Sequence, residues 1–259
     1  LLAGVKFSHT VALISVGFLY LIAIALFVRS KAYEDFAPKE LNLSLSQDLI
    51  IPAALILILL LTYMVRIGTY SPIFYELDPY FYTYAATQLL TVGENPFNDS
   101  TAWYPDLTTN HRIIPVLSYL ESTWYSVYTG GAPYENMLLA VIASMYPPIA
   151  AVLAVFFVYL LVSVSTKREW GLVAAGLATF LPVFVYKLAS GEQEIQPYAF
   201  FALAFFYSMY VISLKRTDIR LPSAKDLSMG KDIIFPLLAG LAFAALALGS
   251  ASQILAIVS

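Results

Sequence analysis

The chain has 259 residues, of which 60% are hydrophobic and 12% charged, with a net charge of −3 and a mean hydropathy of +0.76. Soluble domains average about 45–50% apolar and about 25% charged residues, so this composition indicates a membrane protein. The chain has no cysteine and two histidines, which excludes disulfides, thiolate metal sites and a histidine-based metal site. No basic block suggests a nucleic-acid partner.

Six apolar runs are long enough to cross a bilayer, because a spanning helix needs roughly 20 residues and must satisfy its backbone hydrogen bonds internally. In chain order these runs are about 9–28, 48–66, 137–163, 171–188, 197–214 and 233–257. The weakly charged start of the first run favours a retained span over a cleaved signal peptide. The sequence therefore predicts an all-α, polytopic membrane helix bundle.

The basic residues predict the orientation of this bundle. The connections after the first, third and fifth runs hold most of the 14 Lys and Arg residues, and the positive-inside rule makes their side cytoplasmic. The other side receives a long connection, 67–136, and a short one, 189–196, with about half of the 17 acidic residues. Within the long connection, segments 79–91 and 111–128 have helical apolar spacing and are expected to lie flat on the membrane.

Two acidic motifs stand in these outer connections. The first is YELDPY (75–80), where Asp78 before a proline equally suits the N-cap of a following helix. The second is ASGEQEIQP (189–197), where Glu192 and Glu194 repel each other unless a cation joins them. Carboxylates in this arrangement suit Mg²⁺ or Mn²⁺, the alternative being that both are solvated. We expect the two motifs to meet at the membrane surface.

Four segments in order resemble the catalytic subunit of oligosaccharyltransferase, a membrane glycosyltransferase of the GT-C superfamily, in its archaeal-like form. ELDPYFYTYAATQLL (76–90) resembles the first acidic motif of that family. WYP (103–105) resembles a triplet in its first external loop, MYPPIAAVLAVFFVYLL (145–161) its next span, and LPVFVYKLASGEQEIQPYAFF (181–201) the segment with its second acidic motif. The resemblance covers roughly 49–258.

This resemblance implies transfer of a glycan from a lipid-linked diphosphate donor to the Asn of an Asn-X-Ser/Thr sequon. The site would face outward from a cell membrane, or from the endoplasmic reticulum membrane of a eukaryote. The resemblance implies that Asp78 binds the divalent metal and contacts the acceptor amide, with Glu76 in support. The second motif aligns either as Glu194 with Gln196 or as Glu192 with Glu194. Asp78 and Glu194 are therefore the expected catalytic residues, and the expected metal ligands are Asp78, Glu192, Glu194 and Gln196.

The sequence departs from the family pattern at several positions. Tyr82 stands four residues after Asp78, where the family often has Asn or His, and Tyr84 stands where an Arg is frequent. The family's later external-loop glutamate and its soluble sequon-recognition domain with a WWD-type motif have no counterpart. We therefore expect residues 48–259 to be a GT-C-like catalytic part, truncated at its C-terminus and inactive alone. Residues 1–47 would add an extra span and a cytoplasmic link.

Smaller signals leave alternatives open. His111 and Arg112 could contact the donor diphosphate or could be structural. Lys187 is expected to snorkel to the lipid headgroups, with pairing to the second acidic motif as the alternative. The remaining outer acids, Glu121 among them, are expected to form a solvated face.

Two other functions remain as hypotheses. One is another GT-C transferase that uses a lipid-linked sugar but a different acceptor. The other is a transporter with an acidic outer vestibule. The absence of a clear mid-span acid from the six runs disfavours the transporter.

Overall fold

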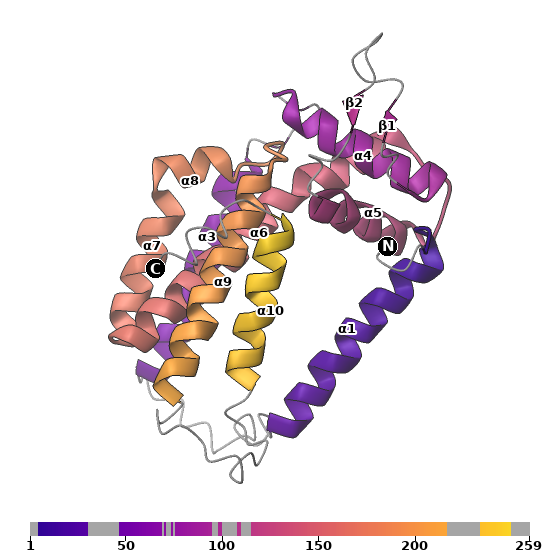
Figure 1. The fold of residues 1–259 in the computed structure, drawn as a ribbon. Helices are drawn as coiled ribbons and strands as arrows, with labels where there is room; N and C mark the ends of the chain where they lie inside the picture. The colour runs from indigo at the N-terminus through magenta and orange to yellow at the C-terminus, as the bar shows by residue number, and fades with distance from the viewer. Residues whose placement is uncertain are drawn as a thin grey trace.

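The computed structural model of the chain is a bundle of helices (Figure 1). It describes residues 5–30, 47–68, 70, 74, 76–94, 98–99, 108–109, 115–216 and 234–249. Within these ranges the elements are helical, apart from one antiparallel pair of two-residue strands, β1 (Asn98–Asp99) and β2 (Thr108–Thr109). The prediction of an all-α fold is confirmed.

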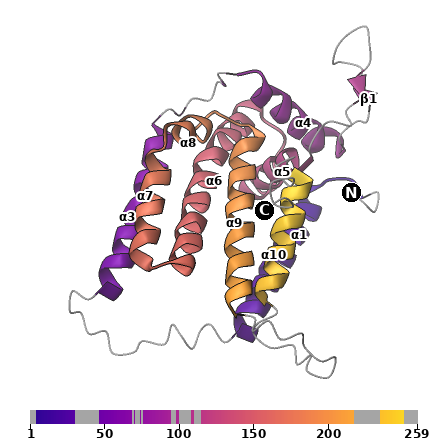
Figure 2. The same cartoon turned by 60° about the vertical axis from the view of Figure 1, so that its left-hand side comes forward.

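Most of the helices run along the bundle, and the others lie across one of its ends (Figures 1 and 2). The lengthwise helices are α1 (His9–Ser30), α3 (Gln47–Ile67), α6 (Asn136–Ser165), α7 (Arg168–Phe180), α9 (Ile195–Arg216) and α10 (Ile234–Gly249). The crosswise helices, uppermost in Figure 1, are α4 (Asp78–Val92), α5 (Pro115–Thr129) and the short α8 (Pro182–Lys187). Both helices predicted in the long outer connection are thus present, as α4 and α5.

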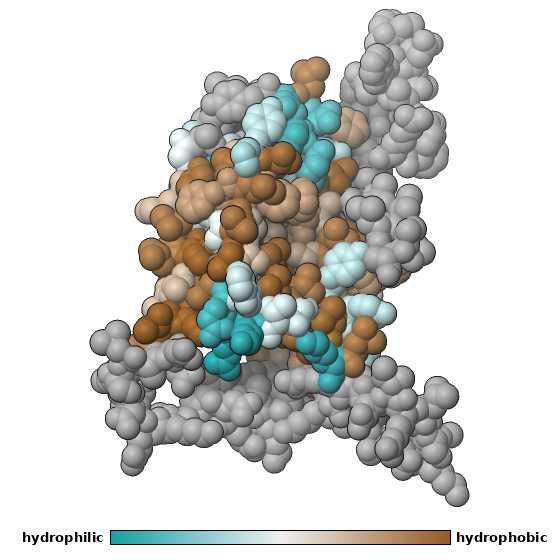
Figure 3. Space-filling view, turned by 90° about the vertical axis from the view of Figure 1, so that its left-hand side faces the viewer, coloured by the Kyte–Doolittle hydropathy of each residue, from teal (hydrophilic) through white to brown (hydrophobic). Residues whose placement is uncertain are grey.

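Three helical segments are long and apolar enough to cross a membrane: Leu49–Ile67, Asn136–Ser165 and Ile195–Lys215. Two shorter apolar helices, His9–Ala25 and Ile234–Gly249, fall on the first and last predicted spans. The flank of the bundle shown in Figure 3 is covered by hydrophobic side chains, with hydrophilic side chains toward its two ends. The chain is therefore a multi-pass membrane protein.

The fourth predicted span, 171–188, is not a single helix. Helix α7 ends at Phe180, and Leu181 has an extended backbone (φ −62°, ψ 120°) before α8 begins at Pro182. Proline has no N–H to donate and disfavours the helical conformation of the residue before it. The prediction of one continuous helix is therefore wrong here, and the break lets α8 turn across the end of the bundle (Figure 1).

Helix α6 is the centre of the packing. It contributes residues to three buried clusters, which join it to α5, α9 and α10, to α3 and α7, and to α4 and α5. Its buried side includes Ala143, Ala150, Ala151 and Ala154. Small side chains of this kind let neighbouring membrane helices approach closely. The long α6 therefore holds the crosswise helices and the lengthwise helices in one framework.

Buried polar groups tie α3 to α7. The hydroxyls of Thr62 and Thr179 lie 2.7 Å apart, and the Arg66 guanidinium donates to the carbonyl oxygens of both threonines, at 3.0 and 3.3 Å. These contacts satisfy polar groups that have no access to water. They place the C-terminal end of α3 beside the break between α7 and α8.

The extra N-terminal helix, α1, contacts the rest of the protein near its first turn. The backbone N–H of Phe7 donates to the Gly93 carbonyl, and His9 Nδ1 lies 3.0 Å from the Ser126 hydroxyl. Farther along α1, large apolar side chains such as Phe18 are exposed. The division of the chain at residue 47 stays a prediction.

We expect Gly171→Ala to weaken the packing of α7 on α6. A Cβ atom at Gly171 would lie 2.9 Å from the Tyr159 carbonyl oxygen and would overlap the Ser163 hydroxyl. This overpacking should cost roughly 1–3 kcal/mol and lower the thermal unfolding midpoint in detergent. Gly176→Ala is the matched control on the same helix, because a Cβ there meets nothing within 4 Å. Equal midpoints for the two variants would contradict this packing.

Candidate functional site

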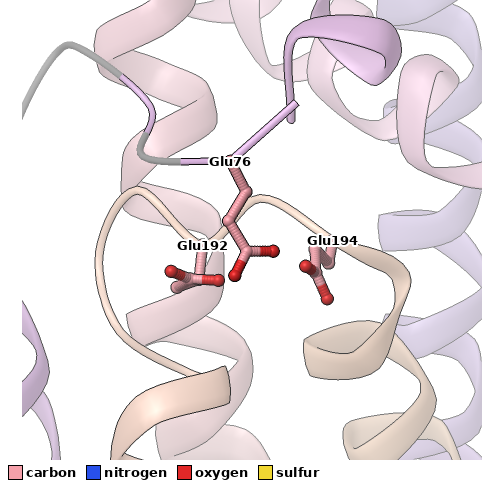
Figure 4. Close-up of side chains that lie close together, drawn as sticks. All are labelled: Glu76, Glu192 and Glu194. Atoms are coloured by element: carbon pink, nitrogen blue, oxygen red, sulfur yellow. The ribbon is translucent and has the colours of Figure 1, made fainter. Parts of the chain in front are cut away.

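The two acidic motifs meet at the end of the bundle that carries the crosswise helices. Glu76 precedes α4, whereas Glu192 and Glu194 lie between α8 and α9. One carboxylate oxygen from each lies within 4.8 Å of the others (Figure 4). We call these residues the carboxylate trio. The expectation that the motifs meet is confirmed, with Glu76 as the member from the first motif.

The other candidate residues lie within two residues of the trio in the sequence or outside the described residues. Asp78 is the exposed first residue of α4, and Gln196 is exposed in the first turn of α9. Burial of Tyr82, followed by the negative charges of Asp78 and Glu194, raises the pKa of Tyr82 to about 12. The carboxylates of Asp78 and Glu194 therefore both interact electrostatically with Tyr82. The remaining two candidates, His111 and Arg112, lie outside the described residues.

The loop that carries the second motif, 188–194, is buried throughout, and we call it the acidic loop. Glu192 is 5% exposed and Glu194 is 4% exposed. The alternative that both are solvated at the interface is therefore wrong. A buried loop must find partners for its backbone polar groups, and this one finds them on α3 and α6.

Helices α3 and α6 hold the acidic loop by hydrogen bonds. The N–H of Ser190 donates to the Arg66 carbonyl at 3.0 Å, and the Ser190 hydroxyl donates to the Ser144 carbonyl at 2.8 Å. Farther along, the Tyr146 hydroxyl donates to the Glu194 carbonyl at 3.2 Å. Gly191 lies between these anchors with φ of 90°, a conformation that favours glycine. The loop therefore has a fixed path over the end of α6.

Lys187, the last residue of α8, places one positive charge beside the three acids of the trio. Its Nζ lies 3.2 Å from Glu194 Oε1, 3.7 Å from Glu76 Oε2 and 4.0 Å from Glu192 Oε2. Lys187 therefore pairs with the acids, and the expectation that it snorkels to the headgroups is wrong. Desolvation lowers the pKa of Lys187, but the hydrogen bond and charge of Glu194, with the charges of the other two acids, outweigh it and raise that pKa.

The three acids differ in their affinity for protons. Burial, assisted by the charge of Glu76, raises the pKa of Glu192. Burial and the hydrogen bond with Glu76 raise the pKa of Glu194. Hydrogen bonds from Glu194 and from the Tyr186 hydroxyl lower the pKa of Glu76. Glu194 and Glu192 therefore bind a proton more readily than an exposed carboxylate does, and Glu76 binds one less readily.

The donor set of the trio fits a divalent cation. Carboxylate oxygens are the ligands preferred by Mg²⁺ and Mn²⁺. Glu192 Oε2 is buried and, among the described residues, has no hydrogen-bond partner. The Lys187 ammonium lies 4.0 Å from it, so a cation bound more closely would stabilise its charge further. Glu76, Glu192 and Glu194 are thus the residues whose positions suit metal binding, and Lys187 supplies positive charge among them.

Glu121 of α5 was expected on the solvated outer face, and that prediction is wrong because it is 0% exposed. Burial raises its pKa to about 8, against the opposing effect of a hydrogen bond from Gln193. The Gln193 side-chain amide donates to Glu121 Oε1, and the Thr83 hydroxyl donates to Gln193 Oε1 at 2.7 Å. The only signal for this network in the sequence is an acid within an apolar helical pattern.

A family and a curated relative match this chain. The family described as oligosaccharyl transferase STT3, N-terminal, matches residues 49–258. The dolichyl-diphosphooligosaccharide–protein glycosyltransferase subunit STT3A of Oryza sativa subsp. japonica is 28% identical over 170 residues. This match covers 62% of the chain and 21% of the relative, so the chain spans about a fifth of that protein.

Solved archaeal structures have a similar fold. The oligosaccharyltransferase AglB from Archaeoglobus fulgidus, in complex with an inhibitory peptide and a dolichol-phosphate, gives a TM-score of 0.67 at 20% identity, covering 80% of this chain and 24% of that one. A structure of the enzyme from the same organism in complex with Zn and sulfate gives 0.62 at 19% identity, covering 76% and 25%. These similarities show that the chain shares the membrane helical fold of the archaeal structures.

We expect Lys187→Met to destabilise the protein more at neutral than at acidic pH. Without the ammonium, the repulsion and desolvation of the trio are unopposed, and the raised pKa values of Glu192 and Glu194 rise further. A carboxyl with a raised folded-state pKa imposes no penalty below its unfolded pKa, and its penalty grows as the pH rises through the folded pKa. The thermal unfolding midpoint of Lys187→Met, taken relative to that of wild type, should therefore decrease as the pH is raised from about 4 to about 7.

The control for this prediction is Lys167→Met. Lys167 is exposed at the start of α7, away from the crosswise helices (Figure 2), so its loss should give no such trend. A loss of stability in Lys187→Met that is independent of pH would contradict the assigned role.

Proposed function

We propose, because the chain belongs to the oligosaccharyl transferase STT3 family over residues 49–258, that it forms the transmembrane catalytic part of an oligosaccharyltransferase. The reaction is transfer of a glycan from a lipid-linked diphosphate to the Asn of an Asn-X-Ser/Thr sequon. The observation that carries this proposal is the carboxylate trio, which two separate motifs form at one end of the bundle. Because the chain spans about a quarter or less of its relatives, the proposal concerns the full-length protein.

Its relatives support the two substrate classes. The rice protein is named for a dolichyl-diphosphooligosaccharide donor and a protein acceptor. The AglB structure contains an inhibitory peptide and a dolichol-phosphate. We therefore propose a lipid-linked oligosaccharide and an acceptor polypeptide as partners, together with the lipids around the bundle. His111 and Arg112 remain proposed contacts for the donor diphosphate.

A divalent cation, Mg²⁺ or Mn²⁺, is the proposed cofactor, and the archaeal complex with Zn supports a metal in this fold. When bound, it would neutralise charge on the diphosphate leaving group as a Lewis acid. Glu192 and Glu194 would hold it beside Glu76, because these three carboxylates already converge. Their convergence supports the Glu192–Glu194 register over Glu194 with Gln196. Asp78 and Gln196, exposed near the trio, are proposed to complete the ligands.

The acceptor amide needs positioning, because an amide nitrogen is a poor nucleophile. Asp78 is exposed at the start of α4, so its carboxylate is open to an N–H of the acceptor. Carboxylates that accept both N–H hydrogens would orient the amide and disturb its conjugation. We propose Asp78 and Glu194 for this task. Lys187 offsets part of the negative charge of the trio through its ion pair with Glu194.

We expect Asp78→Asn in the full-length protein to lower glycopeptide formation by roughly a hundred-fold or more. The measurement is turnover of a sequon peptide with a lipid-linked oligosaccharide and Mn²⁺. Glu94→Gln is the matched control, because Glu94 is an exposed outer acid that pairs with Lys6 at 3.5 Å, away from the trio. EDTA should abolish wild-type turnover, and Mn²⁺ should restore it. Normal turnover in Asp78→Asn would falsify its catalytic role.

We further propose that the end of the bundle with the trio faces the outside of the cell membrane, or the lumen of the endoplasmic reticulum in a eukaryote. The excess of basic residues in the opposite connections supports this orientation.

A single cysteine at position 77 should therefore react with a membrane-impermeant maleimide added from outside. Leu77 is 85% exposed and directly follows Glu76 of the trio, and residues 1–259 contain no cysteine. Lys167→Cys should react only after the membrane is permeabilised. The reverse pattern of labelling would overturn the orientation.

A further inference from the structure

The side chain of Gln193 contacts different parts of the protein from those that its two acidic neighbours contact. Glu192 and Glu194 reach Lys187, whereas Gln193 reaches Thr83 of α4 and Glu121 of α5. Gln193 is 0% exposed. A buried amide with a partner on each side has very little rotational freedom, so its contacts fix the backbone that carries both acids.

The surroundings of Glu121 favour its neutral form over its charged form. It is 0% exposed, and no ion pair among the described residues includes it. Its Oε2 atom has no hydrogen-bond partner in that part of the chain. The group that faces it from α6 is the Tyr146 hydroxyl, which brings no positive charge. A lone charge in such a place costs far more than a neutral carboxyl.

Thr83 connects the same amide to the first acidic motif. Its hydroxyl lies 2.7 Å from Gln193 Oε1 and 2.8 Å from the Pro79 carbonyl oxygen. Pro79 is the buried residue directly after Asp78. The amide of Gln193 thus joins the first turn of α4 to the loop with Glu192 and Glu194. Glutamine suits this place because its amide has both an acceptor and a donor.

We propose that Gln193 is a positioning residue, which Thr83 and the neutral carboxyl of Glu121 clamp so that the two acidic motifs are held together for metal binding. The clamp rests on the proposed function, because it sets the spacing of the proposed ligands. It predicts that loss of Gln193 weakens metal binding and lowers kcat while the KM for the acceptor peptide stays near that of wild type.

The first test is Gln193→Leu in the full-length protein. Loss of the hydrogen bonds should raise the Mn²⁺ concentration for half-maximal turnover about tenfold and lower kcat about tenfold. Without substrates, Mn²⁺ should raise the unfolding midpoint of this variant only at correspondingly higher concentration. Wild-type Mn²⁺ dependence in both measurements would overturn the clamp.

The second test separates the clamp from a general loss of stability. Thr83→Val removes one hydroxyl from the clamp and should raise the Mn²⁺ requirement severalfold. Thr87→Val is the matched control one turn along α4, because the Thr87 hydroxyl bonds to the Thr83 carbonyl and Tyr134 and does not reach the loop. Equal Mn²⁺ requirements for these two variants would overturn the proposal, even where Gln193→Leu does not fold.

The third test addresses the charge on Glu121. Glu121→Gln keeps a neutral carbonyl acceptor for Gln193 and should retain the wild-type Mn²⁺ requirement, whereas Glu121→Leu should behave like Gln193→Leu. A tenfold defect in Glu121→Gln would show that a charged carboxylate is needed and would contradict the neutral clamp. If the wild type binds Mn²⁺ but makes no glycopeptide, the proposed function fails, while the Mn²⁺-induced midpoint shifts still test the clamp.

Discussion

Three carboxylate groups with oxygen atoms within 4.8 Å of one another in a largely buried place repel each other. Their arrangement therefore depends on a nearby positive charge. Lys187 meets that condition from the end of α8. It reaches the trio because α7 stops at Phe180 and Pro182 starts a new helix in another direction. A continuous helix would carry the lysine onward along the bundle. The break in a membrane helix is thus part of the site.

The membrane part of the fold holds the loop that such a site needs. The C-terminal end of α3 and the N-terminal half of α6 present carbonyl and hydroxyl groups to the acidic loop, through Arg66, Ser144 and Tyr146. Two crosswise helices complete the support, with Thr83 from α4 and Glu121 from α5. Backbone groups that are buried without water must be paired, so the loop and its supporting helices order one another.

Much of this fold can be predicted from the chain, because apolar length, helical spacing and basic connections are local signals. The meeting of the two motifs follows from the order of the spans. The remainder depends on distances in the folded protein. Burial of Glu121 and the pairing of Lys187 depend on which helices pack above them, and no local pattern encodes that. The proline at 182 permits a helix break, but the sequence alone does not give the direction of α8.

The acidic loop has only seven residues, 188–194, between the end of α8 and the start of α9. Most of them form a hydrogen bond or an ion pair with a neighbouring helix. The number of residues in this loop is therefore a requirement of the site in addition to their types. An inserted or deleted residue would change which side chains of the loop reach Lys187 and which one reaches α5. A designer who wants to keep this site would have to keep the length of the loop as well as the side chains that bond within it.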